Sequence, residues 1–290
     1  MTQRMTPLDG ARGPGAVHPV TGQAFPSPVP PGMGWPGDPA TAPTPVARDV
    51  RDVLRLAESA DDVDALSATM SLCRACPRLV SWREDVAVVK RAAFADQPYW
   101  GRPIAGWGEP QPRVLVVGLA PAAHGGNRTG RIFTGDRSGD WLFASLHRVG
   151  LAAHERSDHA GDGQRLIGTR MVAAVRCAPP DNKPTTTERD TCAPWLLREL
   201  TLVSGSVRAV VCLGSYAWDT ALRSFRALEY DVPRPKPKFG HGAEADVTSP
   251  DGRAMSLLAS FHPSQQNTFT GKLTEPMLDR VLARAAELGA

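Results

Sequence analysis

The sequence predicts an α/β protein of three layers, in which a central sheet of four mainly parallel strands lies between two layers of helices. Three observations support this fold class. Short aliphatic runs at residues 114–117, 171–175, 207–213 and 255–259 are typical of buried strands. Segments with apolar residues at helical spacing separate these runs. Strands that alternate with helices form a parallel sheet with both faces covered.

The helical segments follow from the same periodicity. Two of them precede the first strand and form a helical lead-in. Others follow the strands, and the last closes the chain with a proline in its first turn. The predicted helices span residues 48–70, 82–95, 140–149, 187–203, 216–228 and 276–288.

Residues 1–47 differ in composition from the rest of the chain. They hold 11 of its 27 prolines and 7 of its 27 glycines, without apolar periodicity. Such a segment cannot bury enough apolar surface to offset the entropy of ordering it. We expect a disordered tail at 1–47, whose partner is unassigned, and one globular domain at 48–290.

Charge and hydropathy exclude several protein classes. No apolar stretch follows the N-terminal residues, so a secretory signal is not expected. No run of 18 apolar residues exists that would form a membrane-spanning helix. The formal net charge of +3 is mild and still permits a local basic face. We expect a monomer in the cytoplasm, with no membrane partner.

Two loops could supply such a basic face. One contains Arg128 and Arg131, and the other contains Arg234, Lys236 and Lys238, alternating with prolines that hold it extended. Either set could instead be an ordinary solvated surface.

The first of these loops also has the glycine spacing of a phosphate-binding loop, at Gly125 and Gly130. It has Arg131-Ile132 where such a loop needs Lys followed by Ser or Thr, which argues against nucleotide binding.

Polar residues follow the first and last strand runs. Gly118-Leu119-Ala120-Pro121 and Phe133-Thr134-Gly135-Asp136 come after residues 114–117, and His262-Pro263-Ser264 comes after residues 255–259. Ligands of open α/β sheets bind beyond the carboxyl ends of the strands. Asp136 and His262 are therefore expected to face one pocket, although more than a hundred residues separate them.

The cysteines divide into two groups. Cys212 lies inside the third strand and is expected to pack in the core. The other four lie outside the strand interiors and suit a metal centre, since disulfides are disfavoured in a reducing cytosol. Their spacing leaves zinc and an iron–sulfur cluster equally open. These candidate ligands are Cys73, Cys76, Cys177 and Cys192.

Together, the three strand-end motifs resemble those of uracil-DNA glycosylases, specifically the iron–sulfur branch called family 5 or type b. The resemblance extends from about residue 72 to the C-terminus. It implies a uracil-DNA glycosylase-like fold and a [4Fe-4S] cluster on the four cysteines, in place of zinc. The cluster would be structural and remote from the pocket of Asp136 and His262.

The implied reaction is cleavage of an N-glycosidic bond in DNA that contains uracil, the first step of base excision repair. Positive charge develops on the sugar and negative charge on the departing base, so an anion and a hydrogen-bond donor are needed. The resemblance assigns these roles to Asp136 and His262. By themselves, the two residues could equally be a helix cap and a structural histidine at the end of a strand.

The base must leave the duplex and enter a pocket. The resemblance implies that Ala120 and Pro121 line this pocket, that Phe133 stacks on the base, and that Asn182 bonds the base or places the water. Core packing of Phe133 and a turn role for Asn182 are the alternatives. The segment after His262 resembles a loop that holds the DNA backbone, through Ser264, Gln265 and Asn267. The resemblance also places Arg128 and Arg131 on the DNA-facing rim, where they are expected to contact DNA.

Two departures from the wider superfamily affect the expected chemistry. No acidic residue occurs at 119–122, where related enzymes often carry a catalytic acid, and this leaves Asp136 as the nearest. Ala173 and Ala174 occupy the stretch where related enzymes read uracil with an asparagine. A pocket with fewer polar groups rejects other bases less strongly. We therefore expect relaxed specificity that includes hypoxanthine and other damaged bases.

Two other functions remain open at this point. The missing acid at 119–122 is compatible with a noncatalytic iron–sulfur or zinc module that binds nucleic acid on the same fold. A redox protein that uses the cluster is also possible, although no redox partner can be identified in the sequence.

Overall fold

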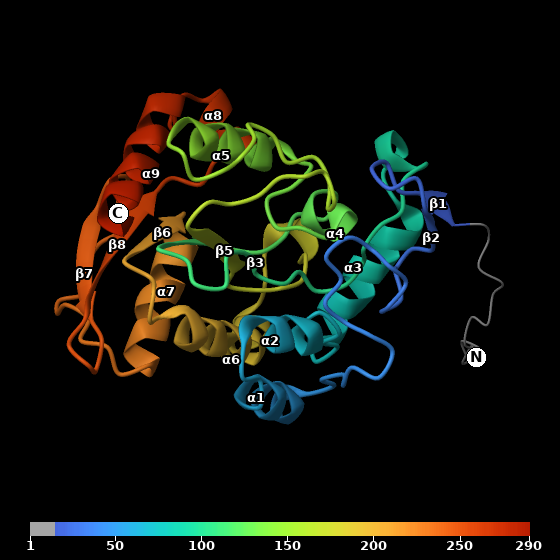
Figure 1. The fold of residues 1–290 in the computed structure, drawn as a ribbon, viewed down its shortest axis with the longest axis horizontal. Coiled ribbons are helices and arrows are strands. Elements are labelled where there is room, and N and C mark those ends of the chain that lie inside the picture. Colours follow the sequence, from blue (N-terminus) through green and yellow to red (C-terminus); the bar gives the residue numbers. More distant parts are fainter. Residues whose placement is uncertain (1–14) are drawn as a thin grey trace, which may run out of the picture.

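The central sheet of the computed structural model, which describes residues 15–290, has six strands in the order β3-β5-β4-β6-β8-β7 (Figure 1). Its four inner strands are parallel and are the ones predicted from the aliphatic runs. They are β4 (Val114–Gly118), β5 (Thr169–Ala173), β6 (Ala209–Leu213) and β8 (Ala254–Ser260).

The sheet is wider than the four strands predicted because an antiparallel strand borders each edge. β3 (Trp107–Gly108) has only two residues, and β7 (Glu244–Thr248) is largely exposed, so neither forms an aliphatic run. The three-layer α/β prediction is otherwise confirmed.

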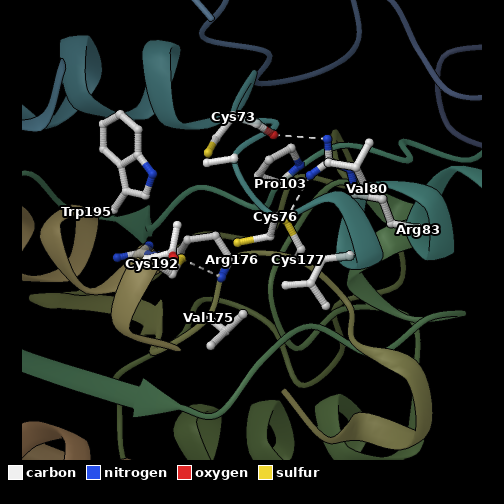
Figure 2. A pocket seen from close by; sticks show the side chains of 13 residues that line it. Cys73, Cys76, Val80, Arg83, Pro103, Val175, Arg176, Cys177, Cys192 and Trp195 are labelled. Carbon is white, nitrogen blue, oxygen red and sulfur yellow. Dashed lines mark hydrogen bonds between the residues drawn. The ribbon is translucent and has the colours of Figure 1, made fainter. Parts of the chain in front are cut away.

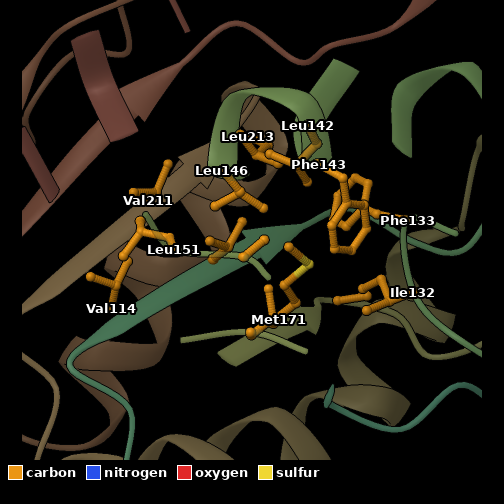
Figure 3. Packing of buried hydrophobic residues seen from close by; sticks show 14 of the residues in the cluster. Val114, Ile132, Phe133, Leu142, Phe143, Leu146, Leu151, Met171, Val211 and Leu213 are labelled. Carbon is orange, nitrogen blue, oxygen red and sulfur yellow. The ribbon is translucent and has the colours of Figure 1, made fainter. Parts of the chain in front are cut away.

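Helices cover both faces of the sheet. The β4 side chains alternate between the two faces, since successive residues of a strand point in opposite directions. Val114 and Val116 share a core with α5 and α9, while Leu115 and Val117 pack against α6 and α7. Figure 3 shows Val114 in the first of these cores, beside Leu151 and Val211. Cys212 lies in the second of these cores, as predicted. The four helices are α5 (Arg137–Arg148), α9 (Glu275–Gly289), α6 (Thr186–Val203) and α7 (Ser215–Ala227).

The helical lead-in has three helices where two were predicted. Two aspartates divide the first predicted segment: Asp49 caps α1 (Val50–Glu58) and Asp62 caps α2 (Val63–Met70). The third, α3 (Pro77–Val89), begins at a proline directly after the second cysteine of the pair. α1 and α2 pack on α6, and α3 leads toward the loop after β4.

The prediction of a disordered tail is wrong for residues 15–47, which we call the N-terminal strap. The strap contains β1 (Ala16–Val17) and β2 (Ala24–Phe25), and it packs against the domain. Phe25 and Trp35 are buried in the main core, and Asp38 forms a buried ion pair with Arg102. The prediction failed because the average composition of the segment gives little weight to these few buried aromatic residues. Residues 1–14 lie outside the described part of the chain.

No helix among residues 15–290 is both long enough and apolar enough to span a membrane.

Candidate active site and cysteine centre

Asp136 lies in the long loop between β4 and α5, directly before the helix. Its Oδ1 accepts a hydrogen bond of 2.9 Å from the Gly139 N–H, so the carboxylate caps α5. Burial raises the pKa of Asp136. The N–H groups of Gly139 and Ser138 counteract this effect by bonding the carboxylate. Asp136 therefore is the helix cap that the sequence left as an alternative, and the capping bond fixes the orientation of its carboxylate.

A second loop segment approaches the other oxygen of the same carboxylate. A Cβ atom built on Gly125 would lie 2.0 Å from Asp136 Oδ2, so only glycine fits here. Gly125 precedes α4 (Gly126–Thr129), a single turn within this loop. The loop after β4 therefore folds back on itself around Asp136.

His262 lies beyond the end of β8. A Cβ atom on Gly214, which follows β6 with φ 92°, would lie 3.4 Å from the His262 Cβ. Asn267 Nδ2 donates a hydrogen bond of 2.8 Å to the His262 carbonyl. Burial lowers the pKa of His262 to about 4, so its ring is neutral near pH 7 and carries one N–H.

Phe133 connects the two sides of this site. Its ring centroid lies 6.1 Å from that of His262, and Asp136 is three residues further along the chain. A Cβ atom on Gly118 would lie 2.6 Å from Phe133 Cζ, so the ring lies against the last residue of β4. Its φ of 51° is uncommon for an aromatic residue, and such strain is often found at functional sites. The Phe133 and His262 rings thus lie together at the carboxyl end of the sheet, and Asp136 follows Phe133 in the same loop.

The prediction that Arg128 and Arg131 contact DNA is wrong, because both guanidinium groups are buried and engaged within the protein. Arg128 donates to the Gly135 carbonyl at 2.8 Å and to Gln97 Oε1 at 2.6 Å. Arg131 forms an ion pair of 2.7 Å with Asp162. These arginines bind within the loop that carries Asp136, and their burial keeps them from phosphate.

Ala120 and Pro121, the residues expected to line the base pocket, form the start of this loop. Pro121 is buried, and its Cβ would lie 3.1 Å from a Cβ built on Gly126. Ala120 packs against a small apolar cluster that includes Cys76 and Cys177. The cysteine region therefore contacts the first residues of the loop that ends at Asp136.

Asn182 ends the 3₁₀ turn η2 (Pro180–Asn182) and is exposed. Asp181 and Asn182 both have positive φ, at 53° and 55°, a conformation that Asp and Asn tolerate in turns. Within residues 15–290 its side chain makes no hydrogen bond, and no contact joins it to Asp136 or His262. The structure therefore does not bring Asn182 into the site.

The segment after His262 forms α8 (Gln265–Phe269), with Ser264 at its N-cap position. Gln265 is exposed and Ser264 is half-buried, so both remain accessible. Asn267 instead bonds the His262 backbone, and its side chain is a support for the histidine.

Four cysteines line one small cavity of about 20 Å³, and Figure 2 shows their side chains around it. They come from separate elements: Cys73 and Cys76 precede α3, Cys177 follows β5, and Cys192 lies in α6. Burial raises the pKa of Cys76 to about 12, and it also raises the pKa of Cys73 and Cys192.

Hydrogen-bond donors and cations surround these sulfurs. Arg83 Nη1 lies 2.8 Å from Cys177 Sγ, and the Arg176 backbone N–H donates to Cys192 Sγ at 3.4 Å. Glu199 pairs with both Arg170 and Arg176, which leaves one uncompensated positive charge in that buried group. The uncompensated cations suit an anionic group such as a metal centre held by thiolates.

The four sulfurs do not converge on one point. Among residues 15–290, no three Cys, His, Asp or Glu side chains are placed to hold a single metal ion. A tetrahedral zinc site would need all four sulfurs about 2.3 Å from one ion.

Sequence reasoning missed Arg83. It lies on the buried face of α3 with Leu79 and Val86, at the i, i+4, i+7 spacing of an apolar stripe. A charged residue on such a stripe was the available signal, because a buried charge requires a partner.

The sequence model of the uracil DNA glycosylase superfamily matches residues 105–286, a range that contains Asp136, Phe133 and His262. A protein of Mycobacterium tuberculosis named type-5 uracil-DNA glycosylase is 58% identical over 272 residues, which cover 94% of this chain and 98% of the relative. A protein of Thermus thermophilus with the same name is 48% identical over 227 residues, which cover 78% of this chain and 98% of the relative.

Proposed function

The chain belongs to the uracil-DNA glycosylase superfamily, and we propose that it hydrolyses the N-glycosidic bond of uracil in DNA as the first step of base excision repair. One observation carries the proposal: the Phe133 ring, three residues before the Asp136 carboxylate, lies 6.1 Å from the ring of the neutral donor His262 at the carboxyl end of the sheet. We assign its work to the cytoplasm, at the nucleoid, as a monomer.

In this reaction the bond between C1′ of the sugar and the base nitrogen breaks, and its electron pair leaves with the base. The oxygen of a water molecule then bonds to C1′, and the water releases a proton. The Asp136 carboxylate stabilises the positive charge on the sugar, and its fixed orientation suits the placement of that water. The neutral His262 ring donates its N–H to the base oxygen, where negative charge develops.

The flipped base stacks on Phe133 between Ala120-Pro121 and His262. Ala173 and Ala174 are fully buried and offer the base no polar side chain. This supports relaxed specificity, with hypoxanthine and other deaminated or damaged bases as further substrates. The exposed amide of Asn182 stays a candidate for contact with the base or the water once DNA is bound.

Lysines near His262 replace the buried arginines as candidate DNA contacts. Phe261 precedes His262, and the exposed Lys272 Nζ lies 4.8 Å from the centroid of the Phe261 ring. Phe239 packs on the same ring at 6.2 Å, which brings the neighbouring, exposed Lys238 to this region. With Ser264 and Gln265, these lysines suit the DNA backbone.

The four cysteines are proposed to hold a [4Fe-4S] cluster. Their donor set, their separate elements and the buried cations around them fit such a group. When bound, the cluster supplies a covalent cross-link between the lead-in helices and the sheet. It supplies no step of the reaction.

The test uses the full chain, purified without oxygen, and duplexes that carry one uracil opposite guanine or one hypoxanthine. Strand scission that appears only after alkali is expected on both, because a monofunctional glycosylase leaves an abasic site. Absence of scission on the uracil duplex, with DNA binding intact, would contradict the proposal and favour a binding module. Scission of the uracil duplex alone would show that the enzyme does not excise hypoxanthine.

A further inference from the structure

Arg83 touches the cysteine centre with its side chain. It is only 1% exposed, and it donates from Nη1 to Cys177 Sγ at 2.8 Å and from Nη2 to the Cys73 carbonyl at 3.0 Å (Figure 2). These two cysteines are distant in sequence, since Cys73 precedes α3 and Cys177 follows β5. Arg83 therefore docks α3 onto both parts of the centre.

The backbone of the same residue touches the loop of the catalytic acid. Asn127 Nδ2 donates to the Arg83 carbonyl at 3.1 Å, and Asn127 is 1% exposed. The Asn127 N–H in turn bonds the Ala122 carbonyl at 3.1 Å, which closes the loop segment that contains Gly125. Gly125 is the residue that lies against Asp136 Oδ2.

A second contact joins the same two regions. Ala120 packs in one cluster with Leu79 of α3 and with Cys177. The Val175 N–H bonds the Leu119 carbonyl at 2.9 Å, so the chain that leads into Cys177 is also bonded to this loop. A displacement of α3 or of Cys177 would thus be transmitted to the loop by packing and by hydrogen bonds.

The positive charge of the buried Arg83 guanidinium requires an anion nearby, so the placement of this side chain depends on the charge of the cysteine centre. Its Nε is buried with no hydrogen-bond partner, and the nearest carboxylate oxygen, Glu84 Oε1, lies 3.9 Å from Nη2 and also pairs with Arg74. A buried cation without a close anion is costly. A centre held by four thiolates supplies that anion beside Nη1.

We propose that Arg83 is a positioning residue that couples the occupied cysteine centre to residues 119–136, so that occupancy of the centre sets the position of Asp136. The inference rests on the proposed function and on its cluster. Arg83 itself touches no substrate.

The test compares the wild-type chain with R83Q and R83K, and with R74Q as a control that removes a partly exposed cation near the same centre. Iron and sulfide per chain are measured first. Chains with full iron are then assayed for DNA affinity and for the single-turnover rate of uracil excision. We expect R83Q to be slower by about tenfold or more at unchanged affinity, R83K to recover part of the rate, and R74Q to match the wild type.

Hydrogen exchange supplies a readout that does not need activity. In iron-loaded R83Q, and in the wild type stripped of iron, we expect faster exchange across residues 119–136 and unchanged exchange in the β6 strand. A fully loaded R83Q with the wild-type rate and wild-type exchange would overturn the inference. An inactive wild type would refute the proposed function, and the exchange result would still decide the coupling.

Discussion

Both oxygens of the Asp136 carboxylate have close neighbours that hold the side chain in place. Its Oδ1 caps α5, and glycine at position 125 lets the loop close against Oδ2. The cap restricts the rotation of the side chain, so the negative charge is held in place before substrate arrives. Preorganised charge of this kind is a large source of rate enhancement in enzymes.

The pH dependence of excision should follow Asp136 and His262. Asp136 must be ionised, and its raised pKa moves the loss of activity on the acid side to a higher pH than an ordinary carboxyl would give. His262 has a pKa of about 4, so it is neutral above that pH and gains a proton only in acid. The single-turnover rate should therefore rise with pH and then stay level through neutrality, which a profile between about pH 4 and 9 would check.

A fall in rate as pH increases from about 6 to 8 would contradict this assignment. It would mean that a protonated group, such as a cationic histidine, takes part in the reaction. His262 replaced by Gln provides a comparison that retains an N–H donor without a titratable ring. In this variant, the loss of rate at acid pH should come from protonation of Asp136 alone.

At the scale of elements, the N-terminal strap shows how a few aromatic residues order a proline-rich segment. Trp35 packs on the rings of His18, Phe25 and Trp100, with centroids 4.6, 5.2 and 5.8 Å away. A Cβ on Gly130 would lie 2.5 Å from Trp35 Nε1, so the strap also lies against the loop of the active site. The strap is part of the core, and it supports this loop.

Trp35→Ala should lower the free energy of unfolding by about 3–5 kcal/mol, the usual cost of truncating a buried aromatic side chain. Met33→Ala is the matched control, since Met33 lies in the same strap and is 40% exposed. It should change stability by no more than about 0.5 kcal/mol. Urea denaturation of the full chain measures both. Equal small effects would show that the strap is not integral to the fold.

Over the whole molecule, the fold was predictable and parts of the site were not. The inner strands carry aliphatic runs, so these four strands followed from local pattern, whereas the roles expected of Asp136, Phe133 and His262 came from the resemblance of the strand-end motifs to those of a known family. Arg128 and Arg131 were misread because a charge in a loop carries no local sign of burial, which here depends on Gln97 and Asp162, distant in sequence. Arg83 differs, because its place on the apolar stripe of α3 was a local signal of burial that the prediction did not use.

Whole-molecule charge also predicts how binding responds to salt. Lys238 and Lys272 lie around Phe261 near the site, whereas Arg51 on α1 lies at the opposite end of the molecule from α8 (Figure 1). Replacing both lysines with alanine should reduce the slope of log affinity against log salt concentration by about 2, or about 1 for each phosphate contact. Arg51→Ala should leave the slope unchanged.

Titration of a labelled duplex over a range of salt concentrations measures these slopes. The double lysine variant should keep the wild-type single-turnover rate at saturating DNA, because neither lysine touches the reacting atoms. An unchanged slope would mean that the DNA backbone lies on another face.

The most direct test of the central claim is the single-turnover rate of uracil excision by D136N, measured with iron-loaded protein at saturating duplex. Asparagine caps helices about as well as aspartate, so the fold and the α5 cap are retained while the negative charge is removed. We predict a rate lower by on the order of 10²-fold or more, with unfolding stability and DNA affinity close to those of the wild type. A rate within a few-fold of the wild type would contradict the assignment of Asp136 as the catalytic anion.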